Sequence, residues 1–166
     1  MPLDRLSASW REQYVREATA NERTGDVNDC VFCELLADGV SNSTGILEVT
    51  SFAFTVLNAY PYGSGHVLVL PVRHIASLEE LSDEEATGYF AQLRRTVAAV
   101  KAAYQPDGLN VGFNLGRAAG AGIPQHLHGH VLPRWNGDTN FMTSLGETRV
   151  LPESLIETWR KISAAL

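Results

Sequence analysis

The sequence predicts a single α+β domain, built on an antiparallel sheet of about five strands with one long helix packed on it and further helices at the termini. The chain has 166 residues, of which 45% are hydrophobic, and this is enough for one well-formed core. Short apolar segments bounded by turn-forming residues recur along it and are typical of strands. One long segment, residues 82–103, instead has the pattern of a capped amphipathic helix.

The N-terminal part predicts a helical arm and then two strands. Residues 7–20 place Trp10, Tyr14 and Ala18 on one helical face, and the polar residues that follow them up to position 29 indicate a linker. We therefore assign residues 1–29 to an arm. After a loop around residues 41–45, residues 46–49 and 52–57 are predicted to form two short antiparallel strands.

The remaining elements alternate between strands and helices. Residues 66–70 form a continuous apolar strand that we expect to be buried on both sides, and residues 109–115 form another. Ser82 and Glu85 make a capping box at the start of the long helix. We assign residues 30–145 to the main domain and residues 146–166 to a C-terminal helix packed on it. That helix is predicted to open at Pro152–Ser154 and to bury these apolar residues: Leu155, Trp159, Ile162 and Leu166.

Three of the five histidines stand at alternate positions, His126, His128 and His130. Successive side chains of a strand point to opposite faces, so a strand here would place all three imidazoles on one side. Imidazoles are costly to bury unless they are hydrogen-bonded, bound to metal or used in chemistry, so this segment is interpreted as a site. The glycine- and alanine-rich loop at residues 116–122, which includes Gly120 and Gly122, would let backbone amides approach a ligand closely.

Composition narrows the range of partners. The net charge of −6 argues against nonspecific nucleic-acid binding, which needs a basic surface. No apolar run approaches the roughly 20 residues of a membrane span, and the N-terminus lacks an apolar signal core. We therefore expect a cytoplasmic protein that acts on a small molecule, with no nucleic-acid or membrane partner.

Cys30 and Cys33 are the only cysteines and form a C-x-x-C pair. In a chain without a secretion signal, this spacing indicates a zinc half-site or a redox pair more often than a structural disulfide. No thioredoxin-like pattern surrounds the pair, and two histidines from elsewhere would complete a tetrahedral zinc site. The alternative is that both cysteines simply fill the core.

The segment His126-Leu127-His128-Gly129-His130-Val131-Leu132 resembles the signature of the histidine triad family of nucleotide hydrolases and transferases, in which histidines alternate with apolar residues. The segments 65–71 and 133–141 also resemble the family, the second its bacterial diadenosine tetraphosphate phosphorylase/hydrolase-like branch. The resemblance implies the histidine-triad fold. Gly129 departs from the signature, and a glycine there is expected to weaken strand packing. Gly122 departs too, where other branches carry serine or glutamine.

The resemblance also implies roles for individual residues. By motif position His128 is the nucleophile, while His130 and His66 contact phosphate or protonate the leaving group. Asn58 would hold the ribose, and Asn114 the ribose or a phosphate. His126 would orient the site, either directly or as a ligand of a structural zinc ion. By position, the zinc ligands are Cys30, Cys33, His74 and His126.

The implied activity is cleavage of dinucleoside polyphosphates through a nucleotidyl-histidine intermediate, as a hydrolase if water attacks the intermediate and as a phosphorylase if inorganic phosphate does. Two alternatives stay open: an adenosine phosphoramidase of the same family, and a zinc-stabilised nucleotide-binding module without turnover. No cluster of carboxylates indicates a Mg²⁺ requirement. The family resemblance also implies a homodimer.

Overall fold

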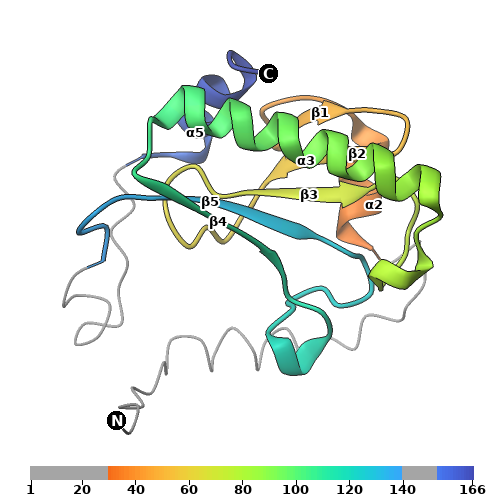
Figure 1. The fold of residues 1–166 in the computed structure, drawn as a ribbon. Coiled ribbons are helices and arrows are strands. Elements are labelled where there is room, and N and C mark those ends of the chain that lie inside the picture. The colour runs from red at the N-terminus through yellow and green to blue at the C-terminus, as the bar shows by residue number, and fades with distance from the viewer. Residues whose placement is uncertain (1–29, 140–152) are drawn as a thin grey trace, which may run out of the picture.

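An antiparallel sheet of five strands forms the centre of the molecule (Figure 1). In this computed structural model the described residues are 30–139 and 153–166, so the predicted helix over residues 7–20 and its linker lie outside them. The strands, in the spatial order β1-β2-β3-β5-β4, are β1 (Ile46–Val49), β2 (Ala53–Leu57), β3 (Val67–Pro71), β4 (Gly108–Phe113) and β5 (Gly129–Arg134). The predicted α+β fold class is confirmed.

The strand that carries the histidine motif lies inside the sheet. The chain forms β1, β2 and β3 in sequence, crosses through the long helix to the far edge as β4, and returns as β5 between β3 and β4. Every pairing is antiparallel, and β5 places His130 opposite Leu68 of β3 and Gly112 of β4. A strand with neighbours on both sides has a fixed register, so the backbone of this motif is held on two sides from Gly129 onward.

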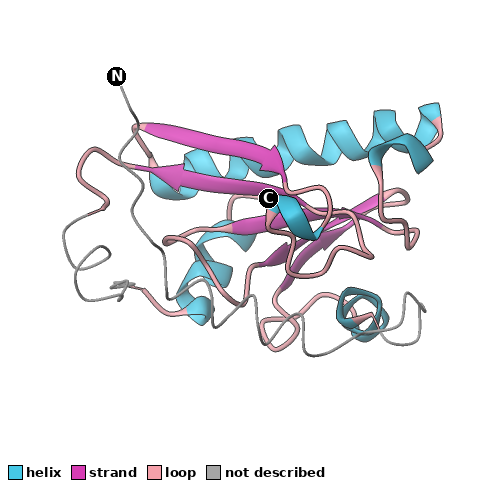
Figure 2. Ribbon diagram, turned by 90° about the horizontal axis from the view of Figure 1, so that it is seen from below, coloured by secondary structure: helices cyan, strands magenta, loops and turns pink. Residues whose placement is uncertain are grey.

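Helices cover both faces of the sheet. α3 (Asp83–Tyr104) and α5 (Leu155–Ser163) pack on one face, and Figure 2, seen from below, shows α3 behind the strands. α2 (Val31–Asp38) covers the opposite face. β3 contributes Val67 and Val69 to the core under α3, and Leu68 and Leu70 to the core under α2. The prediction that this strand is buried on both sides is confirmed.

The start of α3 agrees with the sequence prediction. Ser82 is its N-cap: the Glu85 N–H donates to the Ser82 hydroxyl, and the Ser82 N–H donates to the Glu85 carboxylate. The boundaries of β2, β3 and β4 differ from the predicted ranges by one or two residues. β3 begins at Val67 rather than at position 66, and β4 ends at Phe113, so Asn114 lies just beyond it.

The C-terminal helix begins later than predicted. Ser154 is the N-cap and its hydroxyl accepts the Glu157 N–H, so α5 starts at Leu155 and not at Pro152. The predicted burial is wrong at Leu155, which is 40% exposed: it shares a helix face with the buried Thr158 and Ile162 but is the first residue of the helix.

Three further helical segments were not predicted: α2 and the short 3₁₀ turns η2 (Leu78–Glu80) and η3 (Arg117–Ala119). None of the described helices is long and apolar enough to cross a membrane.

Candidate active site and metal site

The three histidines of the motif lie where the chain enters β5. Only His130 belongs to the strand, so the prediction that all three stand in a strand is wrong. The β3–β5 ladder ends at the pair Val69 and Gly129, and the N–H of Leu127 donates instead to the carbonyl of Ile75. The side chains nevertheless continue to alternate between the two faces as far upstream as His126. The rings of His126 and His128 both pack against Phe32 of α2, with ring centroids 5.7 and 5.6 Å away.

His128 has one free ring nitrogen. Its Nδ1 lies 2.8 Å from the backbone carbonyl of His126, which can only accept, so Nδ1 carries the proton and Nε2 keeps its lone pair. Burial lowers the pKa of His128, and the bond to that carbonyl partly opposes this effect. The ring is therefore neutral at pH 7, and its Nε2 is available as a nucleophile.

His130 and His66 form a hydrogen-bonded pair. The backbone N–H of Tyr62 donates to Nδ1 of His66 at 3.0 Å, so the neutral His66 ring carries its proton on Nε2. That Nε2 lies 3.0 Å from Nδ1 of His130, which must accept. His130 then carries its proton on Nε2, and burial lowers its pKa to about 4. The structure thus fixes a neutral His130 with an N–H donor on the side away from His66.

Two asparagines flank this pair. The Asn58 side chain accepts the Tyr60 N–H through Oδ1 at 2.9 Å, and its Nδ2 lies 3.2 Å from Nδ1 of His66. Asn114 lies on the other side, with its side-chain nitrogen 3.4 Å from Nε2 of His130. The oxygen and nitrogen of an amide exchange places by half a turn, so Asn114 can accept the His130 proton in its other orientation.

A cavity of about 470 Å³ opens in front of these groups, within the range of roughly 300–1,000 Å³ that is usual for small-molecule sites. One wall is apolar and includes Val31, Phe32 and Leu35 of α2. Of the residues predicted for the site, those that line the cavity are Asn58, Gly120, Gly122, His128 and His130. His66, Asn114 and His126 do not line it and contact the site through their neighbours.

The loop of residues 116–122 is closed by its own backbone. Gly116 and Gly120 have φ values of 77° and 92°, which glycine adopts without strain. The amides of residues 119, 120 and 121 donate to carbonyls of Gly116 and Arg117 at 2.9–3.2 Å. These three amides are therefore already bonded, and Gly120 shapes the loop rather than offering a free N–H.

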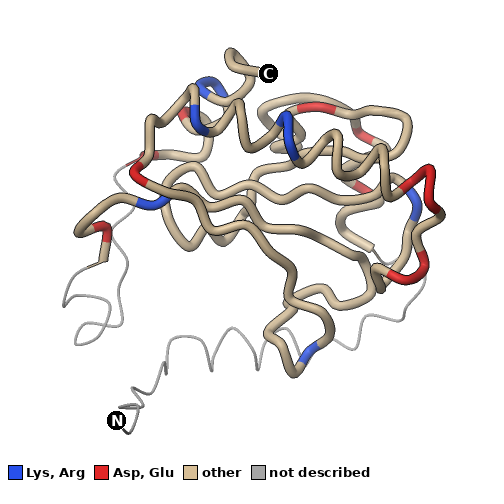
Figure 3. The backbone as a smooth tube through the Cα atoms, in the orientation of Figure 1, with Lys and Arg blue, Asp and Glu red and all other residues tan. Residues whose placement is uncertain are grey.

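Arg117 is a site residue that the sequence analysis missed. It lines the cavity from η3 and is exposed. In Figure 3 the loop that contains η3 carries a blue segment that stands apart from the other blue and red segments. Among the other described basic residues, ion pairs with carboxylates are formed by Arg73, Arg95, Arg134, Arg160 and Lys161. A guanidinium at the mouth of a cavity in a chain of net charge −6 is a local attraction for an anionic ligand.

The four predicted metal ligands come together behind His128. Cys30, Cys33, His74 and His126 each offer one ligand atom, and these atoms lie within 4.8 Å of one another. Nδ1 of His126 is 3.3 Å from Sγ of Cys30 and 3.6 Å from Sγ of Cys33, while Nδ1 of His74 is 3.4 Å from Sγ of Cys33.

These distances fit a tetrahedral zinc site. With Zn–S near 2.3 Å and Zn–N near 2.0–2.1 Å, the edges of the tetrahedron are about 3.3–3.8 Å. Nε2 of His126 lies 3.0 Å from the carbonyl of Pro71, so the proton is on Nε2 and the Nδ1 lone pair faces the thiols. Burial lowers the pKa of His126 to about 4, which keeps the ring in the neutral form that binds metal.

The free thiol of Cys33 favours its protonated form. Burial, and next the neighbouring Cys30, raise the pKa of Cys33 to about 12. Zinc binds thiolates, so a metal that enters this site has to displace protons.

Comparisons with known proteins agree with the fold and the motif. The family described as "HIT domain" matches residues 42–137, and this chain belongs to that family. Among curated relatives, a Mycobacterium tuberculosis protein named "AP-4-A phosphorylase" is 36% identical over 97% of this chain and 83% of its own length. An uncharacterized HIT-like protein from Methanocaldococcus jannaschii is 31% identical over 66% of this chain and 81% of its own length.

Solved structures share the same architecture. A Zn-bound histidine triad family protein from Mycobacterium smegmatis is 29% identical and superimposes with a TM-score of 0.66, covering 84% of this chain and 94% of that one. A Hit-like protein from Bartonella henselae described as involved in cell-cycle regulation is 25% identical, with a TM-score of 0.68 over 85% of this chain and 98% of that one.

Proposed function

We propose that this protein cleaves dinucleoside polyphosphates such as diadenosine tetraphosphate, with His128 as the nucleophile. The observation that carries the proposal is the bond from Nδ1 of His128 to the carbonyl of His126, which leaves Nε2 unprotonated on a residue that lines the cavity. The 36% identical relative named "AP-4-A phosphorylase" supports this choice of substrate.

The first step transfers a nucleotidyl group to the histidine. Nε2 of His128 attacks the α-phosphorus in line, the N–P bond forms, and the bond from that phosphorus to the bridging oxygen breaks. For diadenosine tetraphosphate the leaving group is ATP. The carbonyl of His126 stabilises the positive charge that develops on the ring, and the Nε2–H of His130 donates to a phosphate oxygen as its charge increases.

In the second step an acceptor displaces His128 from phosphorus. Inorganic phosphate gives ADP and regenerates the neutral imidazole, whereas water gives AMP. We favour phosphate as the acceptor, because the named relative is a phosphorylase.

Recognition of the nucleotide uses the other cavity walls. We assign the base to the apolar wall at Val31, Phe32 and Leu35, and the ribose to Asn58, whose Nδ2 keeps a second N–H after its contact with His66. The anionic polyphosphate would extend toward Arg117, because a guanidinium pairs with phosphate in a bidentate manner.

Zinc would be held by Cys30, Cys33, His74 and His126, and when bound it supplies a structural cross-link rather than catalysis. The Zn-bound relative from Mycobacterium smegmatis supports this assignment. A homodimer is also part of the proposal: β4 is an edge strand and its Val111 is 48% exposed, which leaves a surface for a second copy.

Incubation of the pure protein with diadenosine tetraphosphate, with and without inorganic phosphate, tests the reaction. Products that are ADP plus ATP only when phosphate is present support phosphorolysis, and AMP plus ATP indicates hydrolysis. Acid-labile label from an α-³²P substrate should remain on the wild-type protein in the absence of phosphate and be absent from a His128→Gln variant.

A wild-type protein that gives none of these products would refute cleavage of dinucleoside polyphosphates. Turnover of an adenosine phosphoramidate by that same preparation would then favour the phosphoramidase. Nucleotide binding without any product would instead support the remaining alternative, a nucleotide-binding module without turnover.

A further inference from the structure

Tyr89 reaches from α3 to the sheet at Gly129, the residue between His128 and His130. Its side chain is fully buried, and its hydroxyl donates to the carbonyl of Val69 on β3 at 2.8 Å. Burial raises the pKa of Tyr89, and the Gly129 backbone beside it partly opposes the rise. The hydroxyl therefore bonds α3 to β3 at Val69 and packs against Gly129 of β5, at the pair where the β3–β5 ladder ends.

Gly129 leaves the space that this hydroxyl occupies. A Cβ at position 129 would overlap the hydroxyl oxygen of Tyr89 and lie 3.0 Å from Cε1 of Phe113. The glycine is needed here for space and not for a left-handed conformation, because its φ is not positive. The histidine motif has an apolar side chain at this place, and in this chain the tyrosine fills it from the helix. Tyr89 and Gly129 are thus a matched pair.

The contact lies directly behind the two reactive rings. His128 and His130 project from the opposite face of the same backbone, with ring centroids 5.2 Å apart. The ladder to β3 ends at Gly129, so beyond that point the sheet bonds no longer hold the backbone of His128 on β3. The Tyr89 hydroxyl packs against the chain at the point where it leaves β3.

We propose that Tyr89 is a positioning residue, whose hydroxyl fixes the backbone between His128 and His130 and so sets the relative orientation of their rings. Its effect on turnover rests on the proposed function. Its effect on the rings rests on the geometry alone. Displacement of a reacting group by about 1 Å can cost on the order of 100-fold in rate, so a loss of roughly 10–100-fold in kcat is expected for Tyr89→Phe.

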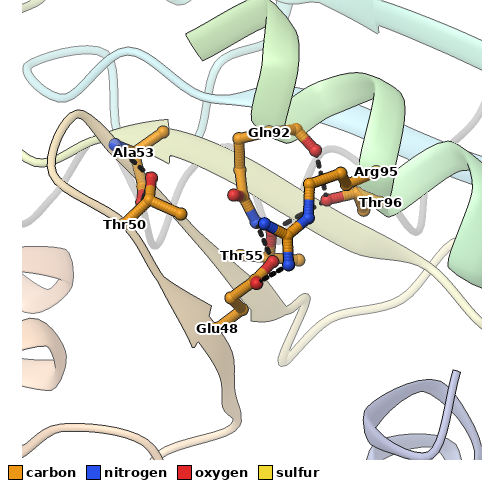
Figure 4. A network of polar contacts seen from close by, with 7 residues as sticks. All are labelled: Glu48, Thr50, Ala53, Thr55, Gln92, Arg95 and Thr96. Carbon is orange, nitrogen blue, oxygen red and sulfur yellow. Dashed lines mark hydrogen bonds and ion pairs between the residues drawn. The ribbon is translucent and has the colours of Figure 1, made fainter. Parts of the chain in front are cut away.

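Thr96→Val is the matched control. Thr96 is also a buried hydroxyl residue on α3, and it bonds Thr55 at 2.8 Å within the polar network of Figure 4, which contains none of the histidines. Both variants remove one buried hydroxyl between the same helix and the sheet, and both should lower the melting temperature. A purely structural role of Tyr89 would make their effects alike.

The experiment makes three kinds of measurement on both variants: steady-state kinetics with diadenosine tetraphosphate, which give kcat and KM; thermal unfolding, which gives the melting temperature; and spectra of the ring resonances of His128 and His130 in the ligand-free protein. Tyr89→Phe should lower kcat far more than it raises KM and should shift both ring resonances. Thr96→Val should change neither kcat nor these resonances. The added variant Gly129→Ala should lose activity, and it should lose less when Tyr89→Phe removes the overlapping oxygen.

Ring resonances of His128 and His130 that are unchanged in Tyr89→Phe would overturn the positioning role, as would equal changes in Tyr89→Phe and Thr96→Val. The spectra need no substrate. If the wild type does not cleave diadenosine tetraphosphate, the proposed function fails while the resonances still decide the role of Tyr89.

Discussion

Replacing Cys33 by serine should remove the zinc site while leaving the groups that line the cavity in place. Cys33 contacts the ring nitrogens of both His74 and His126, so its loss removes one of the four vertices of the predicted tetrahedron. The ligands come from three distant segments: the start of α2, the turn after β3, and the approach to β5. Zinc bound there would connect α2 to the sheet, and the variant should lose that connection.

The size of the effect follows from linkage between binding and folding. A metal present at 100 times its dissociation constant stabilises the folded state by about 2.7 kcal/mol. Each kcal/mol shifts the melting temperature of a domain of about this size by roughly 2–4 °C. The melting temperature of the zinc-loaded wild type should thus exceed that of Cys33→Ser by about 5–11 °C.

The assay combines metal analysis with thermal unfolding. Wild-type protein purified without chelator should contain about one zinc per chain, as one four-ligand site predicts. Cys33→Ser should contain much less. The matched control is the wild type after treatment with a chelator, which should melt close to the untreated variant. Added zinc should then restore the wild type and not the variant.

A wild type without zinc whose melting temperature does not respond to added zinc would refute this reasoning. The two cysteines would then only fill the core between α2 and the sheet. Equal zinc contents of wild type and Cys33→Ser would refute the ligand assignment instead.

Three further predictions concern the cavity. His128→Ala should abolish turnover, by about 10³-fold or more, while nucleotide binding measured by titration persists, and a near wild-type rate would refute the nucleophile assignment. Asn58→Leu should weaken binding of AMP by about 0.5–1.5 kcal/mol per lost hydrogen bond, and 2′-deoxy-AMP should bind more weakly than GMP. A protein that binds 2′-deoxy-AMP as well as AMP but rejects GMP would show that specificity lies in the contacts to the base. The pKa of His130 is lowered from 6.5 to about 4 in the folded protein, so between these pH values the unfolded state binds more protons. The stability that His130 contributes should therefore be lost as the pH falls from about 6.5 to 4. Urea unfolding at several pH values checks this, because the free energy of unfolding should depend less on pH in His130→Gln than in the wild type.

The features that the sequence predicted well depend on local signals. The capping box of Ser82 and Glu85 is formed within four residues, and the apolar strand before Pro71 needs no partner to be recognised. The four metal-ligand positions were carried over from a family resemblance, and the structure brings them together.

The missed features depend on contacts between distant segments. The sequence predicted that Gly129 weakens strand packing, but a residue 40 positions earlier, Tyr89, fills its space, and nothing at position 129 indicates this. α2 had a usable local signal in the spacing of Phe32 and Leu36 and in Gly39, which ends the helix. Arg117 could not be assigned, because a single arginine in a loop is most often only a solvated charge.

Because β5 lies inside the sheet, two parts of the site should differ in how fast their backbone amides exchange hydrogen. The amides of His130 and Val131 lie in β5 between two strands, with a helix behind them, so their hydrogen exchange should require opening of the whole sheet. The loop of residues 116–120 is mostly exposed and held by a few short-range bonds, so it should exchange by small local openings. The ring of His130 is thus attached to a part of the sheet that should exchange slowly, whereas the chain that would meet the polyphosphate can adjust to substrates of different phosphate length.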